Sequence, residues 1–324
     1  MGFLKALFGG KEESAEEKAQ KENERKFDIL KYDGVRARKA GEIEYAVRCF
    51  REALTYGKDV ETMSFLAEAL VAGKKPEEAY KVLEKQAELE PERIGTRLSM
   101  AHVDEILQNF ERMDHDCTAA LQIAPDHANA LYLSAKAKHA LHDELNAVAL
   151  LTRAILQDEH LWDAYLLRAE ILQAMGSLQD AETDIDHLLQ APEPEEEALM
   201  KKAELRLQQN DAEQAILYYN KVKTQNPLLG KAYVGLSTAY SVNRQLDRAL
   251  ETMNEALEIM PDYGEGYKER GRIKMLLNDK AGSLDDLKKA IEADPETAKS
   301  LEGKFTNIEQ EMNEAYRFRN PYGF

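Results

Sequence analysis

Two short stretches of the chain read almost alike. The first is "IAPDHANALYL", residues Ile123–Leu133, and the second is "IMPDYGEGYKE", residues Ile259–Glu269. Their Pro-Asp pairs, which begin at Pro125 and Pro261, lie 136 residues apart, or four times 34. A phrase that recurs at a multiple of a short period predicts tandem structural repeats, so the same period should run through the sequence between them.

The 34-residue period does extend over most of the chain. Steps of 34 from Pro125 fall on proline at five of seven positions from 91 to 295, although the chain has only 9 prolines. Small residues recur in one register at Ala67, Ala101, Ala135, Ala169, Ala203, Ser237 and Gly271. Larger side chains recur in another at Leu83, Cys117, Leu151, Ile185, Tyr219, Met253 and Leu287. This self-similarity predicts stacked units and overrides the two domains that a length of 324 residues would suggest.

Each unit is predicted to contain two helices. Within each half of the period the apolar residues are spaced by three or four, and a polar turn such as Met175–Asp180 separates the halves. The proline cannot continue the second helix, because it lacks an N–H and clashes with the preceding turn. We expect the aspartate after it to cap the next helix, with Asp262 and Glu265 forming a capping box.

This pattern resembles that of the tetratricopeptide repeat family. The best match reads Tyr233-x2-Leu236-Ser237-x2-Tyr240, Ala249-x3-Met253 and Pro261, and the first unit has Leu30, Gly34, Ala46 and Phe50. The resemblance implies an all-α fold: a right-handed α-solenoid (superhelix) of stacked antiparallel helix pairs with a C-terminal capping helix. The expected repeats are 27–59, 60–93, 94–127, 128–161, 162–195, 196–229, 230–263 and 264–297.

The two ends lie outside this register. Residues 1–26 form a charged segment, expected to be partly disordered or a solvated helix. Its start, 1–8, has apolar residues at helical spacing; a membrane anchor, a partner-binding peptide and a cover for the first unit all stay open. Residues 298–324 are predicted to supply the capping helix, with Leu301, Phe305, Ile308, Met312 and Tyr316 on one stripe. The tail 317–324 is either disordered or a docking peptide.

The charge balance narrows the choice of partners. The chain has 43 Lys and Arg against 60 Asp and Glu, for a net charge of −17. Phosphate binding needs a positive footprint, so this argues against nucleic acid, and equally against an anionic membrane as the main partner. Membrane association through residues 1–8 would therefore be weak. The sequence lacks an 18-residue apolar run and a signal peptide, which predicts a cytoplasmic location.

No group of residues predicts catalysis, a metal or a cofactor. His139 and His142 have a metal-compatible spacing, but they fall in a predicted surface turn without further ligands. Asp114–Cys117 brings His and Cys together, yet Cys117 occupies a core position, as Cys49 does. The sequence therefore predicts a protein that is not an enzyme.

In the family that the repeats resemble, the first helices line a concave surface that binds peptides or partner helices. The carboxylate clamp of one subset is missing here, because Val35 and Phe65 replace its asparagines. The expected groove residues are Asp163, Leu166, Leu167, Glu170, Glu197, Met200, Lys201, Glu204, Lys231, Val234, Thr238, Glu265, Lys268, Glu269 and Arg272. We expect a protein or peptide partner with apolar anchors and some positive charge. The alternative is a structural or membrane-proximal assembly factor that self-associates or is tethered through its N-terminal segment.

Overall fold

The computed structural model describes residues 14–190 and 195–294. All the regular secondary structure in these residues is helical, and it forms sixteen helices. The predicted capping helix and tail lie outside the described residues, as does the segment 1–8. The chain divides into two compact units, Met1–Arg168 and Ala169–Phe324, and the division falls inside one helix, α9.

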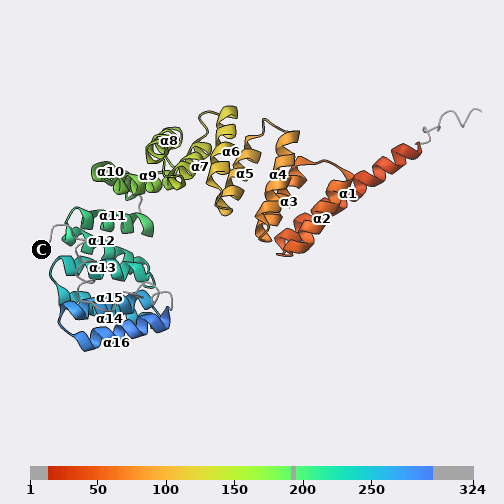
Figure 1. The fold of residues 1–324 in the computed structure, drawn as a ribbon. Coiled ribbons are helices and arrows are strands. Elements are labelled where there is room, and N and C mark those ends of the chain that lie inside the picture. The colour runs from red at the N-terminus through yellow and green to blue at the C-terminus, as the bar shows by residue number, and fades with distance from the viewer. Residues whose placement is uncertain (1–13, 191–194, 295–324) are drawn as a thin grey trace, which may run out of the picture. The chain divides into compact units, whose positions relative to one another are not determined.

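In the first unit the helices follow one another as neighbours. They are α1 (Ala15–Lys39), α2 (Ile43–Tyr56), α3 (Val60–Ala72), α4 (Pro76–Leu89), α5 (Ile94–Ile106), α6 (Phe110–Ile123), α7 (Ala128–Ala140) and α8 (Glu144–Gln157). Each of these helices packs on the next one, and α1 also contacts α3 while α5 contacts α7 (Figure 1). The odd-numbered helices of neighbouring pairs therefore lie side by side.

The second unit repeats this arrangement. Its helices are α10 (Leu178–Leu188), α11 (Glu196–Gln208), α12 (Ala212–Gln225), α13 (Gly230–Val242), α14 (Leu246–Ile259), α15 (Gly264–Leu276) and α16 (Lys280–Ala293), preceded by the last turns of α9 (Trp162–Ala174). Consecutive helices from α10 to α16 pack on one another, and α13 contacts both α11 and α15.

The 34-residue register is visible in the backbone. In each pair, the turn between the two helices contains one residue with positive φ. These residues are Gly41, Lys74, Gln108, His142, Gly176, Asn210, Arg244 and Asn278. Their spacing is 33 once and 34 thereafter, so the first join is one residue shorter than the others. Six of the eight are not glycine, although the left-handed conformation disfavours L side chains.

The predicted packing positions are buried. Ala101, Ala135, Ala169, Ala203 and Ser237 are inaccessible to solvent. On the second helix of each pair, the larger residues of the repeat are also buried, from Leu83 to Leu287. Small side chains let two helices approach, and the bulky ones fill the space beside them, so these two positions account for most of the core.

The predicted role of the Pro-Asp pairs is half right. The helices α6 and α14 end two residues before Pro125 and Pro261, as expected for a residue that cannot continue a helix. The capping prediction is wrong. His127 is the N-cap residue of α7, and its Nδ1 accepts from the N–H of Ala130 at 3.2 Å.

The predicted capping box at Asp262 and Glu265 is also wrong. Tyr263 is the N-cap residue of α15, and no side chain caps that helix. The N–H of Tyr263 bonds back to the carbonyl of Met260 at 3.1 Å. The aspartate therefore lies inside a turn, and the helix begins beyond it.

Residues 15–26 are helical, and the segment predicted as charged and separate is continuous with the first repeat. The helix α1 begins at Ala15, with Ser14 and Glu17 forming a reciprocal capping box. Every side chain from Ala15 to Lys26 is exposed. The expected boundary at 26/27 therefore falls in the middle of a helix.

Candidate functional site: the first-helix face

The odd-numbered helices of each unit present a common surface, which we call the first-helix face. In the second unit it is formed by the end of α9 and by α11, α13 and α15, because α13 contacts both of its odd-numbered neighbours. Twelve of the fifteen residues predicted from the sequence lie on these helices. The other three, Asp163, Leu166 and Leu167, lie in the part of α9 that belongs to the first unit; Asp163 is exposed and both leucines are half-buried.

Charged side chains link neighbouring helices across this face. The Nζ of Lys201 on α11 lies 3.7 Å from Oε2 of Glu170 on α9 and 3.9 Å from Oε2 of Glu204 on its own helix. Burial raises the pKa of Glu204; Lys201 opposes this shift, and the Glu170 carboxylate adds to it. A half-buried carboxylate of this kind gains from an additional cation, so this part of the face favours a positively charged group.

Apolar side chains lie among these charges. Met200 on α11 and Val234 on α13 are half-buried and pack at the edge of the buried clusters between the helices. Lys231 and Lys268 are exposed on the following helices. The face therefore combines partly accessible apolar groups with charges of both signs.

One predicted groove residue does not face solvent. Glu269 is 7% exposed, and its carboxylate accepts from Ser237 Oγ at 3.2 Å and from Arg272 Nη2 at 2.7 Å and Nε at 2.8 Å. Arg272 also reaches Ser241 Oγ at 3.3 Å. The prediction that Glu269 is open to a partner is wrong, because the small Ser237 leaves space that the carboxylate fills. Glu269 and Arg272 hold α15 against α13.

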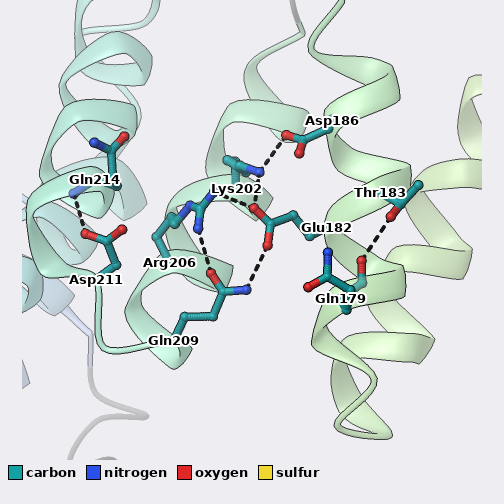
Figure 2. Close-up of polar contacts among 9 residues, drawn as sticks. All are labelled: Gln179, Glu182, Thr183, Asp186, Lys202, Arg206, Gln209, Asp211 and Gln214. Carbon is teal, nitrogen blue, oxygen red and sulfur yellow. Dashed lines mark hydrogen bonds and ion pairs between the residues drawn. The ribbon is translucent and has the colours of Figure 1, made fainter.

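A polar cluster behind α11 was not predicted from the sequence. Lys202 is 1% exposed, and its Nζ donates to Glu182 Oε1 at 2.8 Å and to Asp186 Oδ1 at 2.5 Å (Figure 2). Gln209 Nε2 donates to Glu182 Oε2 at 2.9 Å, and Arg206 pairs with the same carboxylate. Burial opposes the ionisation of Glu182, but the bonds from Lys202 and Gln209 outweigh it and lower the pKa.

This cluster joins α10 to α11. The helix α11 carries Met200, Lys201 and Glu204 on the first-helix face and Lys202 toward α10. Because Lys202 would be a buried unpaired charge without Glu182, the pairing fixes the orientation of α11 and of the residues that it exposes. Only the periodic position of Lys202, next to the small Ala203, could have suggested its burial.

The first unit has its own first-helix face, which the predicted residues do not include. Arg38 on α1 lies over the Phe65 ring of α3, 5.0 Å from its centroid, and pairs with Glu68. Lys136 on α7 pairs with Glu105 on α5. The same kind of ionic link between odd-numbered helices therefore occurs in both units.

The residues considered for catalysis or metal binding have structural roles. Burial raises the pKa of the Cys117 thiol to about 12, so the thiolate needed for nucleophilic attack is not formed at neutral pH. His139 Nδ1 lies 2.7 Å from Glu144 Oε2, and His142 occupies the left-handed turn. Within residues 14–190 and 195–294, no group of three His, Cys, Asp or Glu side chains could hold a metal ion. None of the helices described there is long and apolar enough to cross a membrane.

The helix pairs and their stacking define an α-solenoid of two-helix units. Residues 196–227, which comprise α11 and α12, match the sequence profile of the tetratricopeptide repeat. The chain is a tetratricopeptide repeat protein of about eight repeats.

Solved structures with the same fold cover most of the chain. A tetratricopeptide repeat protein from Parabacteroides merdae is 16% identical, with a TM-score of 0.60 over 80% of this chain and 98% of that one. PilW, a widely conserved type IV pilus biogenesis factor, is 17% identical, with a TM-score of 0.57 over 67% and 98%. The Pseudomonas aeruginosa pilF protein is 15% identical, with a TM-score of 0.53 over 63% and 94%. At these identities the similarity is one of fold.

Proposed function

We propose that the protein is a non-enzymatic scaffold that binds a peptide or helix of a partner protein on its first-helix face. The observation that supports this most directly is the combination of half-buried Met200 and Val234 with the Glu170, Lys201 and Glu204 charges on adjacent helices. Stacked helix pairs form extended binding surfaces of this kind. A segment with apolar anchors and a basic group fits both parts of the face.

The test compares two surfaces of the second unit. Met200→Glu combined with Val234→Glu places charge on the first-helix face, and Leu217→Glu, at a residue 46% exposed on α12, is the matched control. Partners recovered with the wild type and the control but lost with the double variant would be bound on this face. A peptide from such a partner should bind the double variant at least about tenfold more weakly in calorimetry, or roughly 1.4 kcal/mol. Equal binding by all three proteins would refute the proposal.

The second candidate is an assembly factor that self-associates or is tethered through its N-terminal segment. It is favoured by the first turns of α1, where every side chain from Ala15 to Lys26 is exposed. Sedimentation and liposome flotation of the full chain, compared with a chain lacking residues 1–13, test it while leaving α1 intact. If the deletion changes neither measurement, this candidate fails.

Several finer predictions stay proposals. They are the limits of the eight repeats, a capping role for residues 298–324, and a cytoplasmic location.

A further inference from the structure

The outward face of α1 carries exposed apolar side chains. Ile29 is 51% exposed and Tyr32 is 63% exposed. Among the described residues, α1 packs on α2 and α3, and it extends beyond α2 toward its N-terminus (Figure 1). Ile29 and Tyr32 lie three residues apart, so they occupy one side of the helix, away from the buried Gly34 and Ala37.

The repeat register identifies this side of α1. Gly34 precedes Ala46 by 12 residues, and Ser237 precedes Ala249 by the same number. The residues Ile29, Tyr32 and Arg36 of the first repeat therefore correspond to Ala232, Gly235 and Ala239 of the seventh.

In the seventh repeat these positions receive the preceding helix. Ala232 packs with Val222 of α12, and Ala239 packs with Tyr219. The Tyr219 ring lies so close to Gly235 that an added Cβ would be 2.3 Å from it. The side of α1 that holds Ile29 and Tyr32 is thus a stacking surface, and within residues 14–190 and 195–294 no helix precedes α1 to cover it.

We propose that residues 3–8 of the same chain cover this surface, in place of the second helix of a preceding repeat. Phe3, Leu4, Leu7 and Phe8 fall on one side of a helix, and Lys5 falls on the other. This apolar stripe is the counterpart that Ile29 and Tyr32 lack. The inference concerns the end of the array and goes beyond partner binding on the first-helix face.

The chain between the two elements has the required length. The N-cap residue Ser14 and Phe8 are six residues apart, which span at most about 20–22 Å when extended. Ile29 lies about 21 Å along the helix from Ala15, at 1.5 Å per residue. A segment that turns back along α1 therefore brings Phe8 beside Ile29, and one further helical turn brings Leu4 beside Tyr32.

The size of the surface favours this segment over a second copy of the chain. A stable interface between proteins buries about 800 Å² on each side, from roughly 20–30 residues. Two exposed apolar side chains supply a small fraction of that area. A segment tethered a few residues away has an effective concentration in the millimolar range, so it needs far less contact area to remain bound.

The first test is disulfide trapping in the full chain. The pair L4C/Y32C should form an intramolecular disulfide at least about tenfold faster than L4C/N23C under the same oxidant. Asn23 is exposed and nearer in sequence, but it lies on the opposite side of α1, and the native Cys49 and Cys117 are buried. Equal rates would show an undirected tether and overturn the proposal. A disulfide between two chains would overturn it in favour of a second copy.

The second test requires no cysteines. Leu4→Glu combined with Leu7→Glu should speed amide hydrogen exchange in residues 27–36 about tenfold, whereas Lys5→Glu should leave it unchanged. If neither variant changes exchange there, the segment does not cover α1. Because Met200 and Val234 are unchanged in these variants, failure here leaves binding on the first-helix face intact, and the reverse also holds.

Discussion

Asp104 in the first unit and Asp286 in the second have equally buried side chains but opposite electrostatic states. Asp286 accepts from Arg270 Nε at 2.9 Å, from Arg270 Nη2 at 2.7 Å and from Lys274 Nζ at 2.8 Å, so both of its oxygens are paired. Arg112 Nε donates to Oδ1 of Asp104 at 2.7 Å, while the buried Oδ2 has no hydrogen-bond partner. Burial alone therefore does not set the state of a carboxylate; the number and placement of its partners do.

The pKa shifts follow this difference. Burial opposes ionisation of Asp286, but the hydrogen bonds from Arg270 and Lys274 outweigh it and lower its pKa. Burial raises the pKa of Asp104, Arg112 only partly offsets the shift, and the nearby Asp116 carboxylate adds to it. The third repeat thus holds two buried carboxylates close together, where the eighth holds one that is fully paired.

The largest effect is expected from Arg270→Ala. It removes the bidentate partner and leaves Asp286 with Lys274 alone, which should lower the free energy of unfolding by about 3–4 kcal/mol. Urea unfolding followed by circular dichroism, with hydrogen exchange in α16, measures it. Arg248→Ala, at an exposed residue on α14, is the control and should cost less than about 0.5 kcal/mol. A loss below about 1 kcal/mol for Arg270→Ala would mean that the pair does not hold α15 to α16.

Tyr80→Phe tests how the third repeat satisfies its second carboxylate. Tyr80 Oη donates to Asp116 Oδ2 at 2.8 Å, and the Arg112 guanidinium lies 3.6 Å from the centroid of the tyrosine ring. Removing the donor to a buried charge should cost about 2 kcal/mol. The same change at the exposed Tyr32 should be neutral in thermal unfolding. A neutral Tyr80→Phe would show that Arg97, 3.6 Å from Asp116, is sufficient.

Acid titration should separate the two aspartates by sign. The folded-state pKa of Asp286 is lowered, so its ionisation stabilises the fold above the unfolded pKa of about 3.9, and this contribution is lost as pH falls through the folded value. The folded-state pKa of Asp104 is raised, so its ionisation costs stability at neutral pH, and the cost disappears as pH falls below about 3.9.

The measurement is unfolding free energy against pH for the wild type, Asp286→Asn and Asp104→Asn. Each unit of pKa shift corresponds to about 1.4 kcal/mol. The advantage of the wild type over Asp286→Asn should shrink on acidification. Its difference from Asp104→Asn should move the other way, and two differences that change in the same direction would invalidate the comparison.

The smallest effect at neutral pH is expected from Asp104→Asn. The amide oxygen can still accept from Arg112, and the change removes a desolvated charge, so the cost should stay below about 1 kcal/mol. Asp286→Asn under the same conditions provides the matched comparison and should cost more. If Asp104→Asn were the more damaging of the two, Asp104 would have to be ionised and better paired than its contacts indicate.

The sequence predicted the helices because their signal is local. Apolar spacing of three or four and a small residue every 34 specify which side of each helix is buried, and Ala135 and Ala203 are indeed inaccessible. Capping was predicted poorly. The backbone turn after Pro125 and Pro261 consumes the aspartate, so a cap depends on where the helix begins and not on which residue follows the proline.

The candidate site was less predictable than the fold. Most of the predicted groove residues are exposed or half-buried, but Glu269 is buried against Ser237 of a different helix. Lys202 looks like any surface lysine in the sequence, yet it pairs with Glu182, 20 residues away. A periodic pattern identifies the buried side of a helix, but it does not say which polar side chain on the neighbouring helix will meet it.

The sequence by itself determined the period, the helix pairs and the close-packed positions. These depend on steric size and hydrophobicity, which repeat along the chain. Only the tertiary structure decided the left-handed turns at residues such as Lys74 and Arg244, and the opposite states of Asp104 and Asp286. Turn geometry is imposed by the two helices that it joins, and the state of a buried charge depends on partners brought close by packing, so neither is encoded in the residue alone.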